Sequence, residues 1–289
     1  MAMAPPPSES APWTKHQRRA EVLRERHPFA AEVLALYLEL VPVWQDGWRL
    51  TRELRPDAGR LAAWAGERVA PAVVAATEAA GPEPLAKASR DLLDAGGLGR
   101  PLLAWLTGGP AAAELGPVER YLARATLRAP LVALEADAGV ACAPVDRSDR
   151  TCPRCGGAPQ FSVRAAADDP LVSGGRQLVC CRCDHTWNYS GSACPSCAET
   201  TGSRRTVYAE KHSGTVIGRL APDQPVAEAP TFPHLRIDAC ASCERYVIDV
   251  DLGRDPRAVP EVDELAALPL DLYAADQGLT KITPNLMGF

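Results

Sequence analysis

Apolar residues recur at helical spacing through the first half of the chain. Between Phe29 and about Leu50 they lie three or four positions apart, which predicts a core helix that Pro42 bends or splits in two. The same spacing returns in four further stretches, at residues 58–80, 84–95, 101–106 and 118–134. We therefore predict an all-α helical domain over residues 14–140, preceded by a Pro-rich, disordered segment at 1–13.

A polar helix is predicted near the start of this domain, over residues 15–26. Its basic residues are Arg18, Arg19, Arg24 and Arg26. We predict that these form a solvated face balanced by Glu21 and Glu25, in preference to a docking surface for an acidic partner.

The pattern changes to short β-like runs beyond a predicted linker at 141–150. Residues 158–164, 176–179 and 246–250 have the composition of strands, and a Gly-Gly pair at 174–175 marks a turn. The hydrophobic period thus indicates helices first and hairpins afterwards.

Together these elements predict an α+β fold: an N-terminal all-α helical domain, two tandem rubredoxin-like or zinc-ribbon β modules, and a short C-terminal helix. That helix is expected over 260–276, with acidic residues in its first turn near the positive end of the helix dipole. The predicted boundaries are 14–140 for the helical domain, 151–193 for the first four-Cys ribbon, 194–252 for the second, and 253–289 for the C-terminal helix and tail.

Four Cys-x-x-Cys pairs lie in the ribbon region and are the strongest chemical feature of the chain. Two such turns facing each other supply four thiolates in a tetrahedron, at about 2.3 Å from the metal when it is zinc. The spacing favours one cluster from the first two pairs and a second from the last two, while a cluster from the two middle pairs is the second choice. The predicted metal ligands are Cys152, Cys155, Cys180, Cys183, Cys194, Cys197, Cys240 and Cys243.

Other interpretations of the cysteines remain open at this point. Disulfides would suit an oxidising compartment, but no apolar signal segment is seen at the N-terminus, so we expect reduced thiols in the cytoplasm. Catalytic dithiols are a further alternative. Cys142 and Cys181 are left over, and His185 is near enough to replace a ligand. Spacing does not distinguish iron from zinc, because tetrahedral four-sulfur coordination suits both.

Composition and charge narrow the class of partner. The chain is 46% hydrophobic and 23% charged, with a net charge of −5. No apolar run approaches the roughly 18 residues of a membrane span, so no membrane partner is expected. Residues 151–250 carry ten basic and ten acidic residues, and this neutrality argues against nucleic acid as the partner.

The order of the motifs along the chain resembles the FdhE family, the accessory proteins of formate dehydrogenase formation. The resemblance rests on the helical first half, the order of the four Cys-x-x-Cys pairs, and several further motifs. These motifs are Pro28-Phe29-Ala30, Cys152-Pro153-x-Cys155-Gly156, Trp187 after the second pair, Leu270-Asp271-Leu272, Gly278 and Pro284-Asn285-Leu286. Residues 188–192 depart from the family, in which we expect a basic residue there.

The resemblance implies a cytoplasmic maturation protein, or chaperone, that is not itself an enzyme. Such a protein binds the catalytic subunit of a molybdenum- or tungsten-dependent formate dehydrogenase and is required for its activity. The resemblance also implies two rubredoxin-like iron sites held by the eight paired cysteines, with zinc as the alternative. A homodimer is left open.

Two other functions are weighed against this one. A zinc-ribbon nucleic-acid-binding or transcription-type adaptor would bind DNA or RNA with a steep salt dependence. An enzyme using Cys181 or a dithiol as nucleophile would need a neighbouring base, and no such motif is seen. No catalytic or organic-cofactor-binding residues are therefore predicted.

Overall fold

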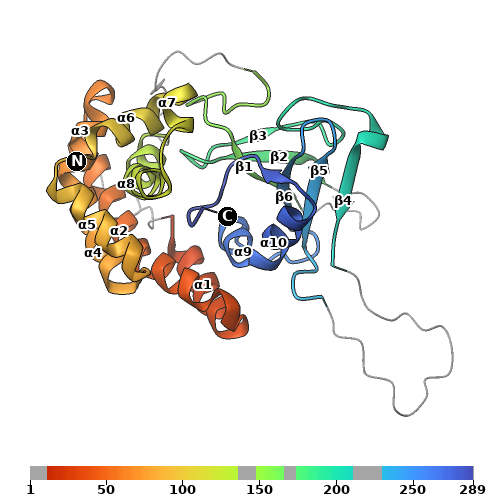
Figure 1. The fold of residues 1–289 in the computed structure, drawn as a ribbon, viewed down its shortest axis with the longest axis horizontal. Coiled ribbons are helices and arrows are strands. Elements are labelled where there is room, and N and C mark those ends of the chain that lie inside the picture. Colours follow the sequence, from red (N-terminus) through yellow and green to blue (C-terminus); the bar gives the residue numbers. More distant parts are fainter. Residues whose placement is uncertain (1–11, 136–147, 166–173, 211–229, 289) are drawn as a thin grey trace, which may run out of the picture.

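The computed structural model of the protein describes residues 12–135, 148–165, 174–210 and 230–288. A helical region and a sheet region lie on opposite sides of the molecule, with two short C-terminal helices between them (Figure 1). The predicted α+β class is confirmed, with its N-terminal helices and a C-terminal sheet that carries two four-Cys clusters. The predicted disordered segment and the predicted linker fall largely outside the described residues.

The helical region is built from amphipathic helices that bury their apolar faces against one another. Trp44 is fully buried, and its Nε1 donates to the carbonyl oxygen of Ala125 at 2.8 Å, which joins α2 to α8. The helices are α1 (Thr14–Arg26), α2 (Ala31–Leu54), α3 (Leu61–Arg68), α4 (Ala70–Ala80), α5 (Glu83–Asp94), α6 (Gly99–Thr107), α7 (Gly109–Ala113) and α8 (Pro117–Glu135).

Proline has opposite effects in two of the predicted helices. The helix α2 runs unbroken through Pro42, so the predicted split does not occur there. The stretch 58–80, by contrast, is divided between α3 and α4. Pro71 lies in the first turn of α4, where its missing N–H costs nothing, whereas inside a continuous helix it would remove a hydrogen bond.

One seven-stranded sheet contains both cysteine modules, in the order β3-β2-β1-β6-β5-β4 with β7 beside β6. Hairpins make each module antiparallel, and the parallel pairing of β1 with β6, where Ser162 is opposite Asp249, joins the two. The strands are β1 (Pro159–Arg164), β2 (Arg176–Cys180), β3 (Thr186–Asn188), β4 (Arg205–Tyr208), β5 (Leu235–Cys240), β6 (Arg245–Asp251) and β7 (Thr280–Lys281).

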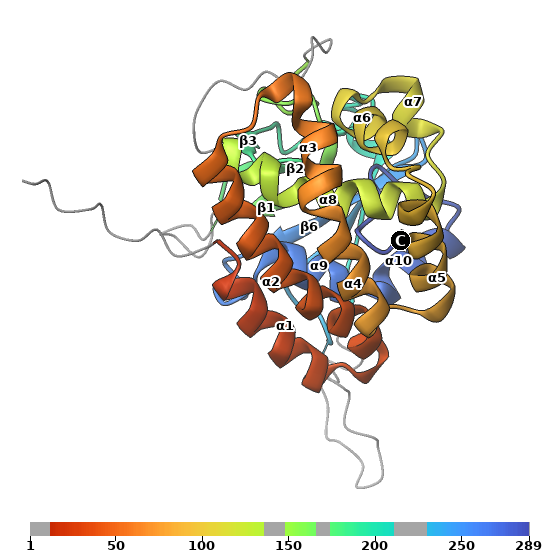
Figure 2. The same cartoon turned by 90° about the vertical axis from the view of Figure 1, so that its left-hand side faces the viewer.

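The predicted C-terminal helix is two helices, α9 (Pro260–Ala266) and α10 (Leu268–Asp276). Pro269 lies in the first turn of α10, so the chain restarts there for the same reason as at α4. The helix α9 packs against α1 and α2 on one side and against β1 and β6 on the other. In Figure 2 it lies behind α2, between the helical region and the sheet.

Buried carboxylates on α9 bind cations from distant parts of the chain. Glu261 contacts Arg128 of α8, and Asp263, which is fully buried, accepts from Nε of Arg19 at 2.9 Å. The predicted solvated face of α1 is therefore wrong at Arg19, which is 8% exposed, although the other three arginines of that face are exposed. The acidic first turn of α9 serves as a set of ion-pair partners as well as suiting the helix dipole.

Candidate metal centres

Each Cys-x-x-Cys pair sits on a tight turn with the same backbone geometry. The residue after the second cysteine has a positive φ in all four turns: 69° at Gly156, 58° at Asp184, 63° at Ala198 and 56° at Glu244. Glycine adopts this conformation without cost and aspartate does so more readily than most residues, so Ala198 and Glu244 are the two held there against a penalty of about 1–2 kcal/mol each. Such a repeated strained position indicates that the turns are shaped to point two sulfurs the same way.

The first cluster joins the turn before β1 to the end of β2 and the turn that follows it. The Sγ atoms of Cys155 and Cys180 are 3.3 Å apart, those of Cys155 and Cys183 are 3.5 Å apart, and those of Cys152 and Cys183 are 3.7 Å apart. All four sulfurs lie within 4.8 Å of one another, and all four cysteines are buried.

The second cluster joins the turn at residues 194–197 to the hairpin between β5 and β6. The Sγ atoms of Cys194 and Cys243 are 3.8 Å apart, and those of Cys197 and Cys240 are 3.7 Å apart. These four sulfurs also lie within 4.8 Å of one another. Cys197 is exposed and Cys243 half-buried, so this cluster is open to solvent on one side.

The sulfur geometry fits a tetrahedral metal ion. With metal–sulfur bonds of about 2.3 Å, the edge of a regular tetrahedron is about 3.8 Å. A disulfide would need about 2.05 Å, which is far below the sulfur–sulfur distances in both clusters. The grouping favoured by the spacing is the one the structure shows, and the two four-Cys clusters are suited to metal binding. That each of the eight thiols binds a metal stays a prediction, as does the choice between iron and zinc.

The thiol chemistry points the same way. Hydrogen bonds from Cys155, Cys180 and Cys183 lower the pKa of the Cys152 thiol. Burial, by contrast, raises the pKa of the Cys180 thiol. The protein alone therefore favours the thiolate at one position and opposes it at another. A cation at the centre would offset the repulsion among four thiolates. Backbone N–H groups help, because those of Arg182 and Ser196 each lie 3.4 Å from a cysteine sulfur.

The leftover candidates lie outside the clusters. Cys181 is buried next to Cys180 but is not one of the four grouped sulfurs, and Cys142 lies outside the described residues. His185 does not replace a ligand, although its carbonyl oxygen accepts from the backbone N–H of Cys180 at 2.9 Å.

Two side chains that the motif reasoning did not single out tie the first cluster to the helices. Arg182 donates from Nη1 to the carbonyl oxygens of Cys155, at 3.2 Å, and Leu106 of α6, at 3.4 Å. Asp184 accepts from Arg128 of α8 at 2.7 Å. Both residues lie within or beside a Cys-x-x-Cys turn, but their partners are far away in sequence, so no local pattern reveals them.

A third group of potential ligands is an ion-pair network instead. His234, Asp255 and Asp263 place ligand atoms within 4.8 Å of one another. The guanidinium of Arg19 contacts both carboxylates, and Nη2 lies 2.9 Å from Asp255. The positive charge of the guanidinium offsets the negative charge of the carboxylates, as a metal ion would.

None of the helices in the described segments has the length and hydropathy needed to cross a bilayer. This finding agrees with the absence of a long apolar run in the sequence.

The chain is similar to FdhE proteins in sequence and in fold. A family model described as FdhE, C-terminal domain, matches residues 223–287. A relative from Aquifex aeolicus called Protein FdhE homolog is 27% identical over 138 residues, which is 48% of this chain and 41% of the relative. A relative of the same name from Pseudomonas aeruginosa is 32% identical over 146 residues, which is 50% of this chain and 41% of the relative. The matched part thus spans less than half of these relatives' own length.

A solved structure extends the likeness to the whole chain. The crystal structure of the FdhE protein from Pseudomonas aeruginosa superposes with a TM-score of 0.66 and 21% identity, and the match covers 97% of this chain and 96% of that one. At this identity the match shows a shared fold. The resemblance to the FdhE family is therefore confirmed, by sequence over about half of the chain and by fold over nearly all of it.

Proposed function

We propose that this protein is a cytoplasmic accessory protein of formate dehydrogenase formation. It binds the catalytic subunit of a molybdenum- or tungsten-dependent formate dehydrogenase and is required for that enzyme to become active. The observation that carries the proposal is the occurrence of two four-Cys clusters in a chain with the FdhE fold. The comparisons do not favour the nucleic-acid-binding alternative.

The eight paired cysteines bind two metal ions, iron in our proposal and zinc as the alternative. Such sites stabilise their domain, because structural zinc sites are worth about 10–16 kcal/mol of apparent binding free energy. Four cysteines complete a tetrahedral shell, so no position is left for a substrate. We therefore assign the clusters a structural role in a protein that is not an enzyme.

The scaffold supports this role because it links the first cluster to the helices. The turn of the first cluster contacts α6 through Arg182 and α8 through Asp184. Binding of the first metal ion orders both anchors, and with them the position of the sheet against the helical region. The resulting rigid surface is what the immature subunit binds.

Gene deletion in the source organism tests the function. We expect formate dehydrogenase activity to fall at least tenfold and to return with the wild-type gene, but not with Cys155→Ser. A matched control is Cys181→Ser, which changes a buried thiol outside the clusters and should restore activity. Full activity in the deletion strain would contradict the proposal.

Purification without air identifies the metal. Iron in four-sulfur coordination gives a red oxidised protein, whereas zinc gives a colourless one. We expect two metal ions per chain, since the structure has two four-Cys clusters. A protein that binds neither metal, with its thiols all free, would remove the structural role of the clusters.

A further inference from the structure

The second metal cluster lies beside a largely buried arginine. Arg205 is on β4, the last strand of the sheet, directly opposite Cys240 of β5, which is one of the four cysteines of that cluster (Figure 1). Residues opposite each other in an antiparallel pair share a face of the sheet, and their Cβ atoms lie about 4.5–5.5 Å apart. The side chain of Arg205 is 11% exposed. A positive charge that solvent only partly screens is therefore held next to the second cluster.

The carboxylates near Arg205 are fewer than the arginines that share them. Asp238 of β5 contacts both Arg205 and Arg176 of β2. The two other shared carboxylates are Asp249, between Arg164 and Arg236, and Asp251, between Arg236 and Arg254. In the described part of the chain, five arginines thus share three aspartates on neighbouring strands and the loop that follows them. Positive charge is in excess beside the second cluster.

The pKa values of two of these arginines agree with the excess. Burial lowers the pKa of Arg176, and the nearby charge of Arg205 lowers it further, although Asp238 opposes both effects. At Arg205, burial also lowers the pKa, but the hydrogen bond and charge of Asp238 raise it. The thiols of Cys194 and Cys240 raise it as well, so the pKa of Arg205 lies above its ordinary value. Sulfurs of the second cluster therefore act as counter-charges to this guanidinium.

A loaded cluster would supply the negative charge that these arginines lack. Four thiolates around a divalent ion leave the site with two negative charges in excess. Water and competing ligands reach the second cluster, because Cys197 is exposed and Cys243 half-buried. A positive charge on the buried side of such a cluster favours the thiolates over the protonated thiols that would release the ion.

We propose that Arg205 is the charge partner of the second metal site. Its guanidinium, oriented by the hydrogen bond to Asp238, offsets the negative charge of the four thiolates and keeps the metal ion bound in a cluster that solvent reaches. This inference rests on the proposed metal binding, and it adds a residue that tunes the site without being a ligand.

Competition with a coloured chelator, which measures the zinc affinity of each site in the full chain, tests the proposal. The Cys243→Ser variant lacks one thiol of the second cluster and so assigns the step that belongs to that site. We expect Arg205→Gln to weaken zinc binding at the second site about tenfold and to leave the first site unchanged. Arg205→Lys, which keeps the charge, should bind within about threefold of the wild type. The matched control is Arg257→Gln, the same change at a side chain that is 84% exposed, which should bind like the wild type.

Two further measurements separate the charge of Arg205 from a role in packing alone. In the iron-loaded protein, oxidation removes one negative charge from the cluster, so Arg205→Gln should lower the reduction potential of the second site and Arg205→Lys should keep it. High salt screens a partly exposed charge, so the zinc affinity of the second site in the wild type should fall more steeply with ionic strength than that of the first. The salt measurement needs no variant, and it decides the question if Arg205→Gln does not fold.

The remaining outcomes separate this role from the metal binding itself. If Arg205→Gln binds zinc at the second site like the wild type, the role of Arg205 is wrong and the proposed metal binding stands. If Arg205→Gln and Arg205→Lys weaken the site equally, Arg205 acts only through its packing with Asp238, and the proposal is overturned. If the wild type binds no metal at the second cluster, the proposed metal binding fails there, and the role of Arg205 with it.

Discussion

Replacing Gly157 by alanine should empty the first metal site and leave the second intact. Gly157 lies just after the first Cys-x-x-Cys turn, and its carbonyl oxygen accepts from the backbone N–H of Cys152 at 2.8 Å. A Cβ at this position would lie 2.6 Å from the Sγ of Cys180 and 3.3 Å from the Sγ of Cys155. The glycine is therefore required by the close approach of the backbone to two sulfurs of the cluster.

The size of the clash sets the expected effect. Non-bonded heavy atoms pack at about 3.5–4.0 Å, so the sulfur of Cys180 must move by about 1 Å. Metal–ligand distances hold to within about 0.2 Å, and a displacement several times larger removes that ligand from the shell. The backbone cannot easily yield instead, because the hydrogen bond to Cys152 closes the turn. The metal content should fall from two ions per chain to about one.

Elemental analysis of anaerobically purified protein measures this directly. The control is Gly99→Ala at the start of α6, where an added Cβ has no atom within 4 Å and the metal content should stay at two. If Gly157→Ala keeps two ions per chain with an unchanged absorption spectrum, the backbone at residue 157 does not pack against the Sγ of Cys180 as closely as the structure indicates.

Three further predictions concern the second site, the ion pairs and pH. A coloured chelator should remove metal in two phases, the faster one from the second cluster, where Cys197 is exposed; a single phase would contradict this. Asp263→Asn should lower the free energy of unfolding by about 3–5 kcal/mol in denaturant titrations, because it removes a charged partner of the buried Arg19. The control is Asp46→Asn at an exposed ion pair, which should change the free energy of unfolding by less than about 1 kcal/mol. Burial lowers the pKa of His16 and of His27 below about 6.5, so below that pH the unfolded chain binds more protons than the folded one and the stability falls as the pH drops. Replacing both histidines by glutamine should make the stability fall less steeply with pH, and an equal slope in the variant would refute the argument.

The sequence was sufficient for the cluster grouping because the relevant information is local. A Cys-x-x-Cys turn aims both sulfurs the same way, and the intervening segments were long enough for the strands that bring two turns together. Gly156 could be recognised as a turn residue. The matching positions Ala198 and Glu244 could not, because alanine and glutamate rarely take a positive φ.

Helix boundaries were harder to predict from the sequence, because a proline can lie inside a helix or begin a new one. Pro42 lies inside an unbroken α2, while Pro71 and Pro269 lie in the first turns of new helices. A proline in mid-helix is tolerated only where packing compensates for the missing hydrogen bond. Tertiary contacts decide that balance, and the local pattern does not contain them.

The ion pairs of α9 show most clearly what sequence reasoning could not reach. Asp263 meets Arg19 from 244 positions earlier, and Glu261 meets Arg128 from 133 positions earlier. Acidic residues at a helix start have a sufficient local explanation in the helix dipole, so nothing in the sequence called for buried partners. Charges of opposite sign on distant elements can pair in many ways, and only the packed structure selects one.

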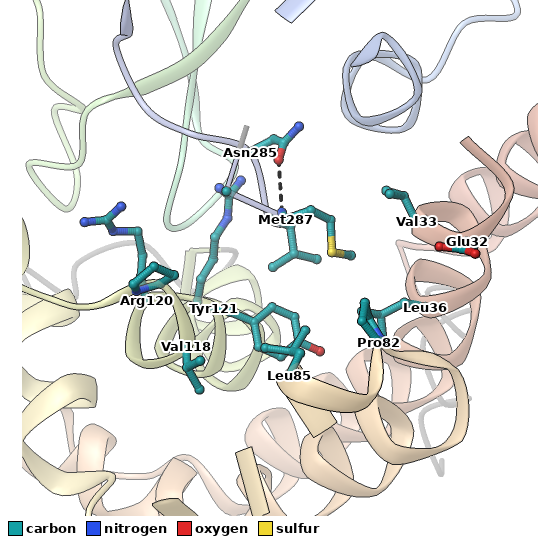
Figure 3. Close-up of a pocket in the computed structure, with 14 residues that line it drawn as sticks. Glu32, Val33, Leu36, Pro82, Leu85, Val118, Arg120, Tyr121, Asn285 and Met287 are labelled. Atoms are coloured by element: carbon teal, nitrogen blue, oxygen red, sulfur yellow. Dashed lines mark hydrogen bonds between the residues drawn. The ribbon is translucent and has the colours of Figure 1, made fainter. Parts of the chain in front are cut away.

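A further long-range contact connects the first metal cluster to the pocket of about 370 Å³ between α8 and the C-terminal tail (Figure 3). The chain runs from Lys281, which binds buried Glu264 of α9, to Thr283, whose Oγ1 donates to the carbonyl oxygen of Pro159 at 2.9 Å. Pro159 begins β1, four positions after Cys155 of the first cluster, and the pocket roof at residues 285–288 begins two positions after Thr283. The roof of the pocket is thus held by the strand that the first cluster orders. Loss of that metal ion should therefore loosen the pocket, even though none of the residues that line it is a cysteine.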